Sequence, residues 1–240
     1  MNFWKKIFLF VLVCSVLTTP VLAEDIIGRL KKVTGSGHVI RNYEQVAAED
    51  DVGIMLGDLL VTGSDGALGV IFDDESRITL GPNSNVKITL YIYNPQQGIF
   101  SFLLNKIKGT FLYISGAIGK LAPNSIRIRT PTAVVGIRGT FFLVKVDQST
   151  EHPNLFVLMP DPETSKVGEI SVTNDAGSVR LSKAHESVQI AAGQQPEDAV
   201  VLSKEKIQEM FNAALEAIPE LKKSWPPPDC ITDPLKPLKG

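Results

Sequence analysis

Alternation of apolar and polar residues, repeated in short stretches from Val33 to Ile190, constrains the fold more than any other feature of this sequence. It is typical of β-strands that bury one face, because successive side chains on a strand point to opposite sides. The segments ALGVIF, RITL and VKITLYIY follow one another within residues 67–93, separated only by DDES and GPNSN. Parallel strands need crossovers of a dozen or more residues, so these short turns predict an antiparallel meander.

Alternation returns after Asn124 in IRIRT, FFLVKV, EISVTN, SVRLS and SVQIAAG. Many short strands with frequent turns favour an antiparallel, twisted β-sandwich or β-roll. We therefore predict an all-β fold, with one domain over residues 24–198. A core of that size should form without disulfides or a structural metal.

The segment from Gly98 to Pro123 is apolar but does not alternate cleanly. Phe102, Leu103 and Ile107 are compatible with a short helix, and TFLYIS with a strand. Two interpretations stay open. The segment either covers the core or forms an exposed apolar patch of the kind that contacts a partner or a membrane.

The C-terminal region predicts one amphipathic α-helix over residues 199–222. Ser203 is a suitable N-cap, and Pro219 lies where the helix should end. Six apolar residues share one helical face: Ile207, Met210, Phe211, Ala214, Leu215 and Ile218. This face is expected to dock on the sheet of its own chain or, alternatively, to bind another protein. Residues 223–240 are proline-rich and are expected to be extended or disordered.

The N-terminal segment has the features of a secretory signal peptide over residues 1–23. Two lysines precede an apolar run at residues 7–17, and small residues lead to an expected cleavage after Ala23. A periplasmic or secreted protein without a transmembrane segment would result. The full chain has a net charge of −2, so no nucleic-acid partner is expected. Cys230 would be the one remaining cysteine, either unpaired or bridging two chains, and the helix offers another route to a homo-oligomer.

No catalytic or metal-binding constellation is evident. The three histidines stand apart from one another and from acids or cysteines at ligand spacing, and no G-x-S-x-G, phosphate loop or dinucleotide motif occurs. The acidic run Asp73–Glu75 is interpreted as a solvated hairpin turn. Paired carboxylates of a glycosidase depend on three-dimensional geometry and stay open. We predict a chain that is not an enzyme and uses no cofactor.

Aromatic residues suggest a surface for a partner. Tyr91 and Tyr93, two apart on a strand, would point the same way and could stack on a sugar, or they could be covered. The candidate partner surface comprises Tyr91, Tyr93, Phe100, Phe102, Phe111 and Tyr113.

The stretch TPTAVVGIRGT resembles the core motif of the FecR-like domain, T-P-x-A-x-x-G-[VI]-R-G-T-x-F. The matching positions include Thr130, Pro131, Gly136, Arg138, Gly139 and Thr140. The run GDLLVTGSDGALGVIFDDESRITLGPNSNVKI is similar to the upstream motifs of that family, except that Glu75 replaces the usual glycine of the D-G-S turn. GEISVTNDAGSVRLSKAHESVQIAAGQ is similar to its closing strands. The resemblance covers roughly residues 33–195.

The resemblance implies a periplasmic all-β module. The best-known members of the family sit in the inner membrane, receive a signal from an outer-membrane receptor and control a sigma factor. This sequence shows no cytoplasmic anti-sigma region before the signal peptide. We therefore expect the module to be shared and not the regulatory circuit.

Arg138 is an isolated charge between two glycines in an apolar run. One hypothesis is a structural clasp in which its guanidinium binds Asp58, the isolated acid of an upstream motif. The alternative is an arginine that anchors a ligand.

Three functions follow from the sequence. The first is a non-enzymatic FecR-like module that binds an envelope protein or glycan. The second is a carbohydrate-binding or carbohydrate-acting envelope protein that uses the Tyr91/Tyr93 face. The third is a structural envelope protein that oligomerises through the C-terminal helix.

Overall fold

The protein is described by a computed structural model, which defines residues 25–147, 152–162, 164–203, 205–207 and 209. Strands dominate the described residues, so the predicted all-β class is confirmed. In chain order the elements are β1 (Ile26–Thr34), β2 (Gly37–Arg41), β3 (Glu44–Ala47), β4 (Gly53–Met55), β5 (Leu59–Thr62), β6 (Ala67–Phe72), β7 (Arg77–Leu80), β8 (Asn85–Asn94), β9 (Ile99–Ile114), α2 (Ala117–Leu121), β10 (Ile126–Arg129), β11 (Val134–Arg138), β12 (Phe141–Val146), β13 (Asn154–Met159), β14 (Glu169–Asn174), β15 (Gly177–Leu181), β16 (Glu186–Ile190) and β17 (Val200–Val201).

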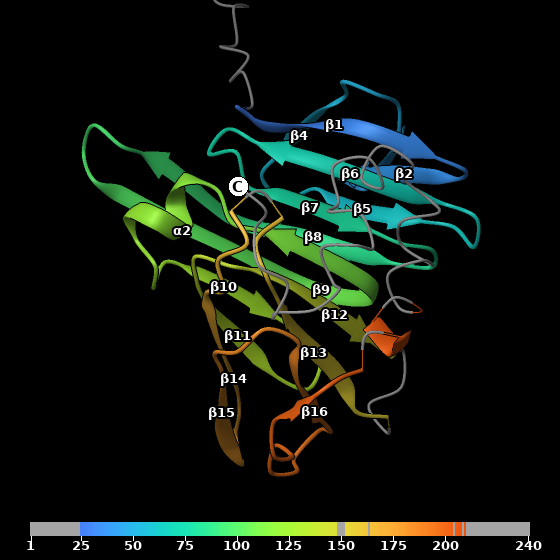
Figure 1. The fold of residues 1–240 in the computed structure, drawn as a ribbon. Helices are drawn as coiled ribbons and strands as arrows, with labels where there is room; N and C mark the ends of the chain where they lie inside the picture. Colours follow the sequence, from blue (N-terminus) through green and yellow to red (C-terminus); the bar gives the residue numbers. More distant parts are fainter. Residues whose placement is uncertain (1–24, 148–151, 163, 204, 208, 210–240) are drawn as a thin grey trace, which may run out of the picture.

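The strands form two sheets that share β9 (Figure 1). Sheet A runs in the order β4, β1, β6, β7, β9, β12, β13, β16, β17. Sheet B runs in the order β3, β2, β5, β8, β9, β10, β11, β14, β15. Every described pairing is antiparallel except that of β9 with β10. The expected sandwich or roll is therefore present, and neighbouring segments of the chain repeatedly change sheets.

The meander predicted for residues 67–93 is only half correct. β6 and β7 form an antiparallel hairpin in sheet A. β8 lies instead in sheet B, between β5 and β9. The turn Gly81–Ser84 therefore carries the chain across the core and does not close a second hairpin in one sheet.

β9 includes the region around residues 102–107, so the short helix with which that sequence is compatible does not form. β9 is a single 16-residue strand. Its first half pairs with β8 and β10 in sheet B, and its second half pairs with β7 and β12 in sheet A. Gly109, at a φ of 85°, lies where the partners change. Because the inward face changes along this strand, the sequence shows no clean alternation.

The main core lies between the two sheets and is built from the inward residues of both. Of the apolar segment, Phe102, Phe111 and Tyr113 belong to this core, so the core-covering interpretation holds for them. The outer face of sheet A carries a second buried cluster, in which Phe141, Leu143 and Val157 pack with Ile207.

The C-terminal helix begins later than predicted. Residues 200–201 form β17 against β16, inside the predicted helical range 199–222. Ser203 is the N-cap, because its Oγ accepts a hydrogen bond from the Lys206 N–H at 3.3 Å. Ile207 docks on sheet A of its own chain, as expected for the apolar face. The part of the predicted helix from residue 210 on, the tail with Cys230 and the predicted signal peptide 1–23 lie outside the described residues.

Candidate functional site

Asp58 is held by Arg41 and not by Arg138. The Arg41 guanidinium donates to both carboxylate oxygens, from Nε to Oδ1 at 2.9 Å and from Nη2 to Oδ2 at 2.7 Å. Nη2 also donates to the Gly53 carbonyl, and the Met55 N–H donates to Asp58 Oδ2. The Asp58 side chain is 0% exposed and that of Arg41 is 20% exposed. The clasp predicted for Asp58 exists, but its arginine comes from β2.

Arg138 is exposed at the end of β11, so the Arg138–Asp58 clasp is wrong. Val135 and Ile137 of β11 point into the core, and alternation turns Gly136 and Arg138 outward. No ion pair or side-chain hydrogen bond of Arg138 is found among the described parts of the chain. Arg138 is thereby left available to a ligand, as the alternative hypothesis required.

The TPTA part of the motif forms the β10–β11 hairpin. The Thr130 N–H donates to the Ala133 carbonyl at 2.9 Å, and the Ala133 N–H donates to Thr130 Oγ1 at 3.1 Å. Pro131 suits the first loop position because its φ is fixed. The buried Asn154 of β13 donates from Nδ2 to Thr132 Oγ1 at 2.7 Å. Thr130 and Pro131 are therefore fold-determining residues.

The glycines and threonine that surround Arg138 are also structural. A Cβ on Gly136 would stand 2.8 Å from Ser171 Oγ of the neighbouring strand. Gly139 adopts a φ of 51°, in the left-handed region that favours glycine. The buried Thr140 exchanges hydrogen bonds with Ser115, from the Thr140 N–H to Ser115 Oγ and from the Ser115 N–H to the Thr140 carbonyl, both at 3.1 Å.

The acidic run Asp73–Glu75 is not simply a solvated turn, because Asp74 is buried. Asp74 Oδ2 accepts hydrogen bonds from Ser76 Oγ at 2.7 Å and from the Ile118 N–H at 3.2 Å, and Oδ1 accepts from Tyr91 Oη at 3.2 Å. Ser76 Oγ lies 3.1 Å from Tyr113 Oη. Burial raises the pKa of the Tyr113 hydroxyl. This network joins the β6–β7 turn to β8, β9 and the start of α2.

Four of the six aromatic residues proposed as a partner surface are in the core. Tyr91 is 9% exposed, and Phe102, Phe111 and Tyr113 are more deeply buried. A register shift between Ile88 and Leu90 explains the error, because the bulge reverses which residues of β8 point inward. Tyr93 and Phe100 are half-buried against the core, with ring centroids 6.1 Å apart.

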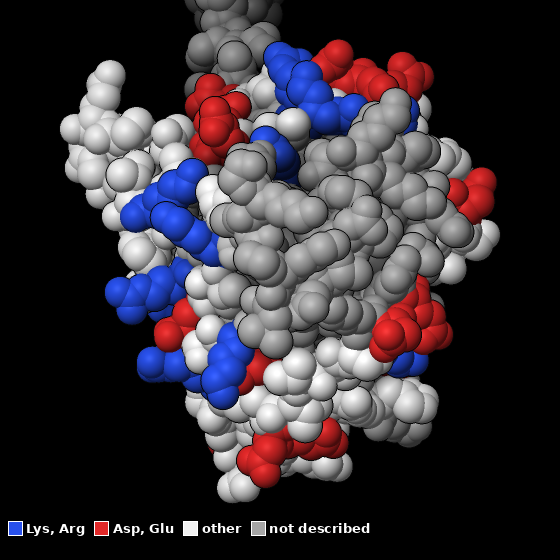
Figure 2. All heavy atoms as spheres, viewed as in Figure 1, with Lys and Arg blue, Asp and Glu red and all other residues white. Residues whose placement is uncertain are grey.

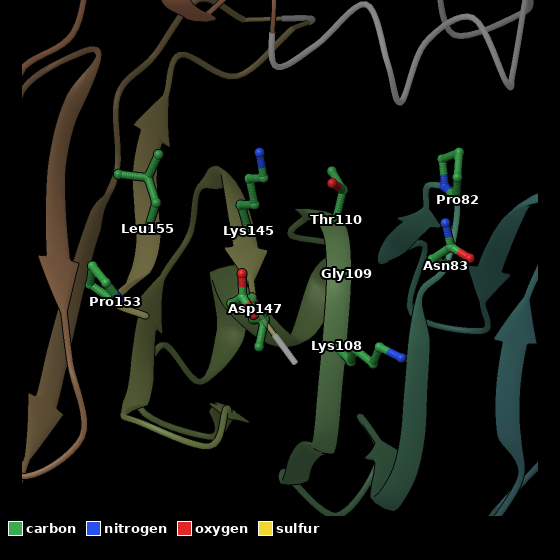
Figure 3. A pocket seen from close by; sticks show the side chains of 10 residues that line it. Pro82, Asn83, Lys108, Gly109, Thr110, Lys145, Asp147, Pro153 and Leu155 are labelled. Atoms are coloured by element: carbon green, nitrogen blue, oxygen red, sulfur yellow. The ribbon is translucent and has the colours of Figure 1, made fainter. Parts of the chain in front are cut away.

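A pocket of about 430 Å³ lies over the junction of β9, β12 and β13 (Figure 3). Its polar lining includes Asn83, Lys108, Thr110, Lys145 and Asp147. Asp147 Oδ1 lies 3.7 Å from His152 Nδ1. Across the described residues, no group of three or more His, Cys, Asp or Glu side chains is arranged to hold a metal ion.

Arginines gather on the outer face of sheet B. Arg127 and Arg129 of β10, Arg138 of β11 and Arg180 of β15 all point outward and are exposed. We call these four residues the arginine face. Figure 2 shows basic side chains along the side of the molecule on which α2, β10 and β14 lie. Sequence reasoning singled out Arg138 alone, although the alternation of IRIRT already placed Arg127 and Arg129 on one face.

Ser171 and Gly136 lie between the arginines. In the register of the sheet, Arg127 is opposite Gly136, Gly136 is opposite Ser171, and Ser171 is opposite Arg180. Arg127 Nη1 is 3.9 Å from the position that a Gly136 Cβ would take. Arg180 Nη1 is 3.5 Å from Glu169 Oε2. The site is thus a basic sheet face with small residues at its centre.

Residues 58–159 match the family model described as FecR protein, which confirms the resemblance to the FecR-like domain. Two crystal structures of a candidate anti-sigma factor from Parabacteroides distasonis, at 1.65 and 2.50 Å resolution, are similar to this chain with 13% identity and a TM-score of 0.48 each. The first match covers 64% of both chains, and the second covers 70% of this chain and 74% of the other. This chain therefore spans about two thirds of the length of these structures. No curated protein matches it.

Proposed function

We propose that this chain is a non-enzymatic, signalling-associated binding module of the bacterial cell envelope, periplasmic or secreted; the match of residues 58–159 to the FecR protein family model supports the signalling-associated role. The arginine face is the observation that carries the proposal. The other motif residues make contacts inside the fold, whereas the motif arginine, Arg138, is exposed on the same face of sheet B as Arg127, Arg129 and Arg180. A charged side chain that contributes little to folding is available for recognition.

Its chemistry suits an anionic partner. Guanidinium groups bind carboxylates and phosphates through two parallel hydrogen bonds, and they do so better than ammonium groups. A carbohydrate-binding module that stacks sugars on Tyr91 and Tyr93 is disfavoured, because the Tyr91 ring lies in the core and is not accessible to a sugar. The proposed binding surface is therefore on sheet B.

Crosslinking in intact cells tests the proposed binding role. A photoreactive amino acid at position 171, between the arginines, should capture an envelope component that is identified by mass spectrometry. The same residue at the exposed position 189 of β16, on sheet A, is the matched control. Equal capture from both positions, or capture of the chain itself alone, would contradict a binding role for this face.

A reporter fusion tests the proposed location. Alkaline phosphatase needs disulfides, which form in oxidising compartments outside the cytoplasm. Fused after the full chain it should be active, and Phe10→Arg, which places a charge in the apolar run, should abolish that activity. An inactive fusion of the unaltered chain would refute the envelope location.

A further inference from the structure

Charge is segregated along the chain. The 71 residues from Ser76 to Val146 contain no Asp or Glu, whereas the whole chain has 26. They contain nine basic residues: Arg77, Lys87, Lys106, Lys108, Lys120, Arg127, Arg129, Arg138 and Lys145. This stretch supplies the centre of sheet B and three of the four residues of the arginine face.

The arginine face is broad and has little acidic character. Arg127 and Arg180 stand at the two ends of one row across four strands, about 14 Å apart at a strand spacing of about 4.8 Å. Glu169 is the one acid among the described outward positions of β10, β11, β14 and β15. The adjoining positions Ser171, Thr173 and Ser178 are hydroxyl residues, which also bind anions.

An uncharged hairpin continues the same face. Residues 88–105, which include the β8–β9 turn, contain no Asp, Glu, Lys or Arg. Ile92 is 38% exposed and Ile99 is 49% exposed. The register pairs Ile92 with Ser101 and Asn94 with Ile99, opposite in orientation to the buried pair Tyr91 and Phe102. The bulge that buried Tyr91 therefore turned Ile92 outward, on the side of sheet B that carries the arginines.

We propose that the arginine face and the adjoining hairpin bind the surface of an anionic lipid membrane. Lipid phosphates meet the guanidinium groups, and the interfacial region of the bilayer accepts Ile92 and Ile99. An acidic protein segment would satisfy the arginines but would leave these aliphatic side chains exposed. This inference rests on the proposed function only for the location in the cell envelope, where the protein would have access to membrane surfaces.

The outer face of sheet A provides a contrast. Its apolar residues Phe141, Leu143 and Val157 are buried with Ile207 of the same chain. The arginine side chains of sheet B stay exposed. Of the two outer faces, sheet B therefore has the charge and the accessibility that a membrane surface requires.

Vesicle binding by the full chain is the test. Vesicles of phosphatidylcholine with or without phosphatidylglycerol serve as the probe, and the measured quantity is the ratio of the two partition coefficients. The variant Arg127→Gln/Arg180→Gln removes both ends of the row. The control Lys31→Gln/Lys183→Gln removes the same charge from exposed positions outside the face. Any contribution of residues 1–23 is common to all three proteins.

Each basic residue near an anionic leaflet is worth about fivefold in binding, so the arginine variant should lower the ratio about 25-fold. The control should change it less than twofold, and 0.5 M salt should abolish the preference of the unaltered chain. Equal effects of the two variants, or no preference for phosphatidylglycerol, would overturn the proposal. Capture of one envelope protein at position 171 without vesicle binding would also overturn it, while leaving the proposed function intact.

Discussion

Arg41 and Arg138 should differ sharply in their effect on stability. The structure pairs Arg41 with Asp58, whereas the sequence suggested Arg138 as the partner. Arg41→Ala leaves the Asp58 carboxylate, 0% exposed, with one remaining hydrogen bond from the Met55 N–H. Removing one partner of a buried ion pair typically costs about 3–5 kcal/mol. Because Arg41 itself is 20% exposed, water can partly solvate the site, and we expect about 3 kcal/mol.

Arg138→Ala is the matched control, since it removes the same type of side chain from an exposed strand position. Its cost should stay within about 0.5 kcal/mol. Urea denaturation followed by circular dichroism measures both free energies of unfolding. In the double variant Arg41→Ala/Asp58→Ala, the cost should be well below the sum of the two single costs, because the pair acts as a unit. A loss for Arg138→Ala as large as that for Arg41→Ala would refute this assignment.

Two further predictions concern the β6–β7 turn and the network beneath it. Glu75 adopts a φ of 64°, in the left-handed region that strains residues with a Cβ atom. Glu75→Gly should therefore stabilise the protein by up to about 1 kcal/mol, while Glu75→Ala, which keeps the strain, should not. A loss of stability in the glycine variant would contradict this. The pKa of Tyr113 is raised in the folded state, so its contribution to stability is fully present below its unfolded pKa of about 10 and is lost as the pH rises above it. Burial raises the pKa of Tyr91 in the same network as well. Each of the two tyrosines should therefore lower the free energy of unfolding by about 1.4 kcal/mol per pH unit above pH 10, and Tyr113→Phe should roughly halve the combined slope in denaturation curves at pH 9–11. An unchanged slope in the variant would show that other groups cause the decline.

Local alternation was sufficient to predict the fold class. A strand such as β10 keeps strict alternation, because it belongs to one sheet and has one inward face throughout. β8 and β9 could not be predicted in the same way. A bulge in β8 reverses its inward face, and β9 changes sheets near Gly109, and neither event has a clear signal in the sequence.

The residues of the candidate site could also be predicted only in part from the sequence. The sequence identified Asp58 as an acid in need of a partner, but the choice between Arg41 and Arg138 depends on which strands are neighbours. β2 pairs with β5, directly after Asp58, whereas β11 lies in the other half of sheet B. Arg127 and Arg129 could have been grouped from IRIRT alone. Arg138 and Arg180 join them only through the register of β10, β11, β14 and β15.

The most direct test of the account is the binding of the single variant Arg138→Gln to phosphatidylglycerol vesicles, measured on protein whose unfolding free energy has been determined. We expect the preference for anionic over neutral vesicles to fall about fivefold while the free energy of unfolding stays within about 0.5 kcal/mol of the unaltered chain. Unchanged binding together with a large loss of stability would contradict the account, since it would make the motif arginine part of the fold and not of the binding surface.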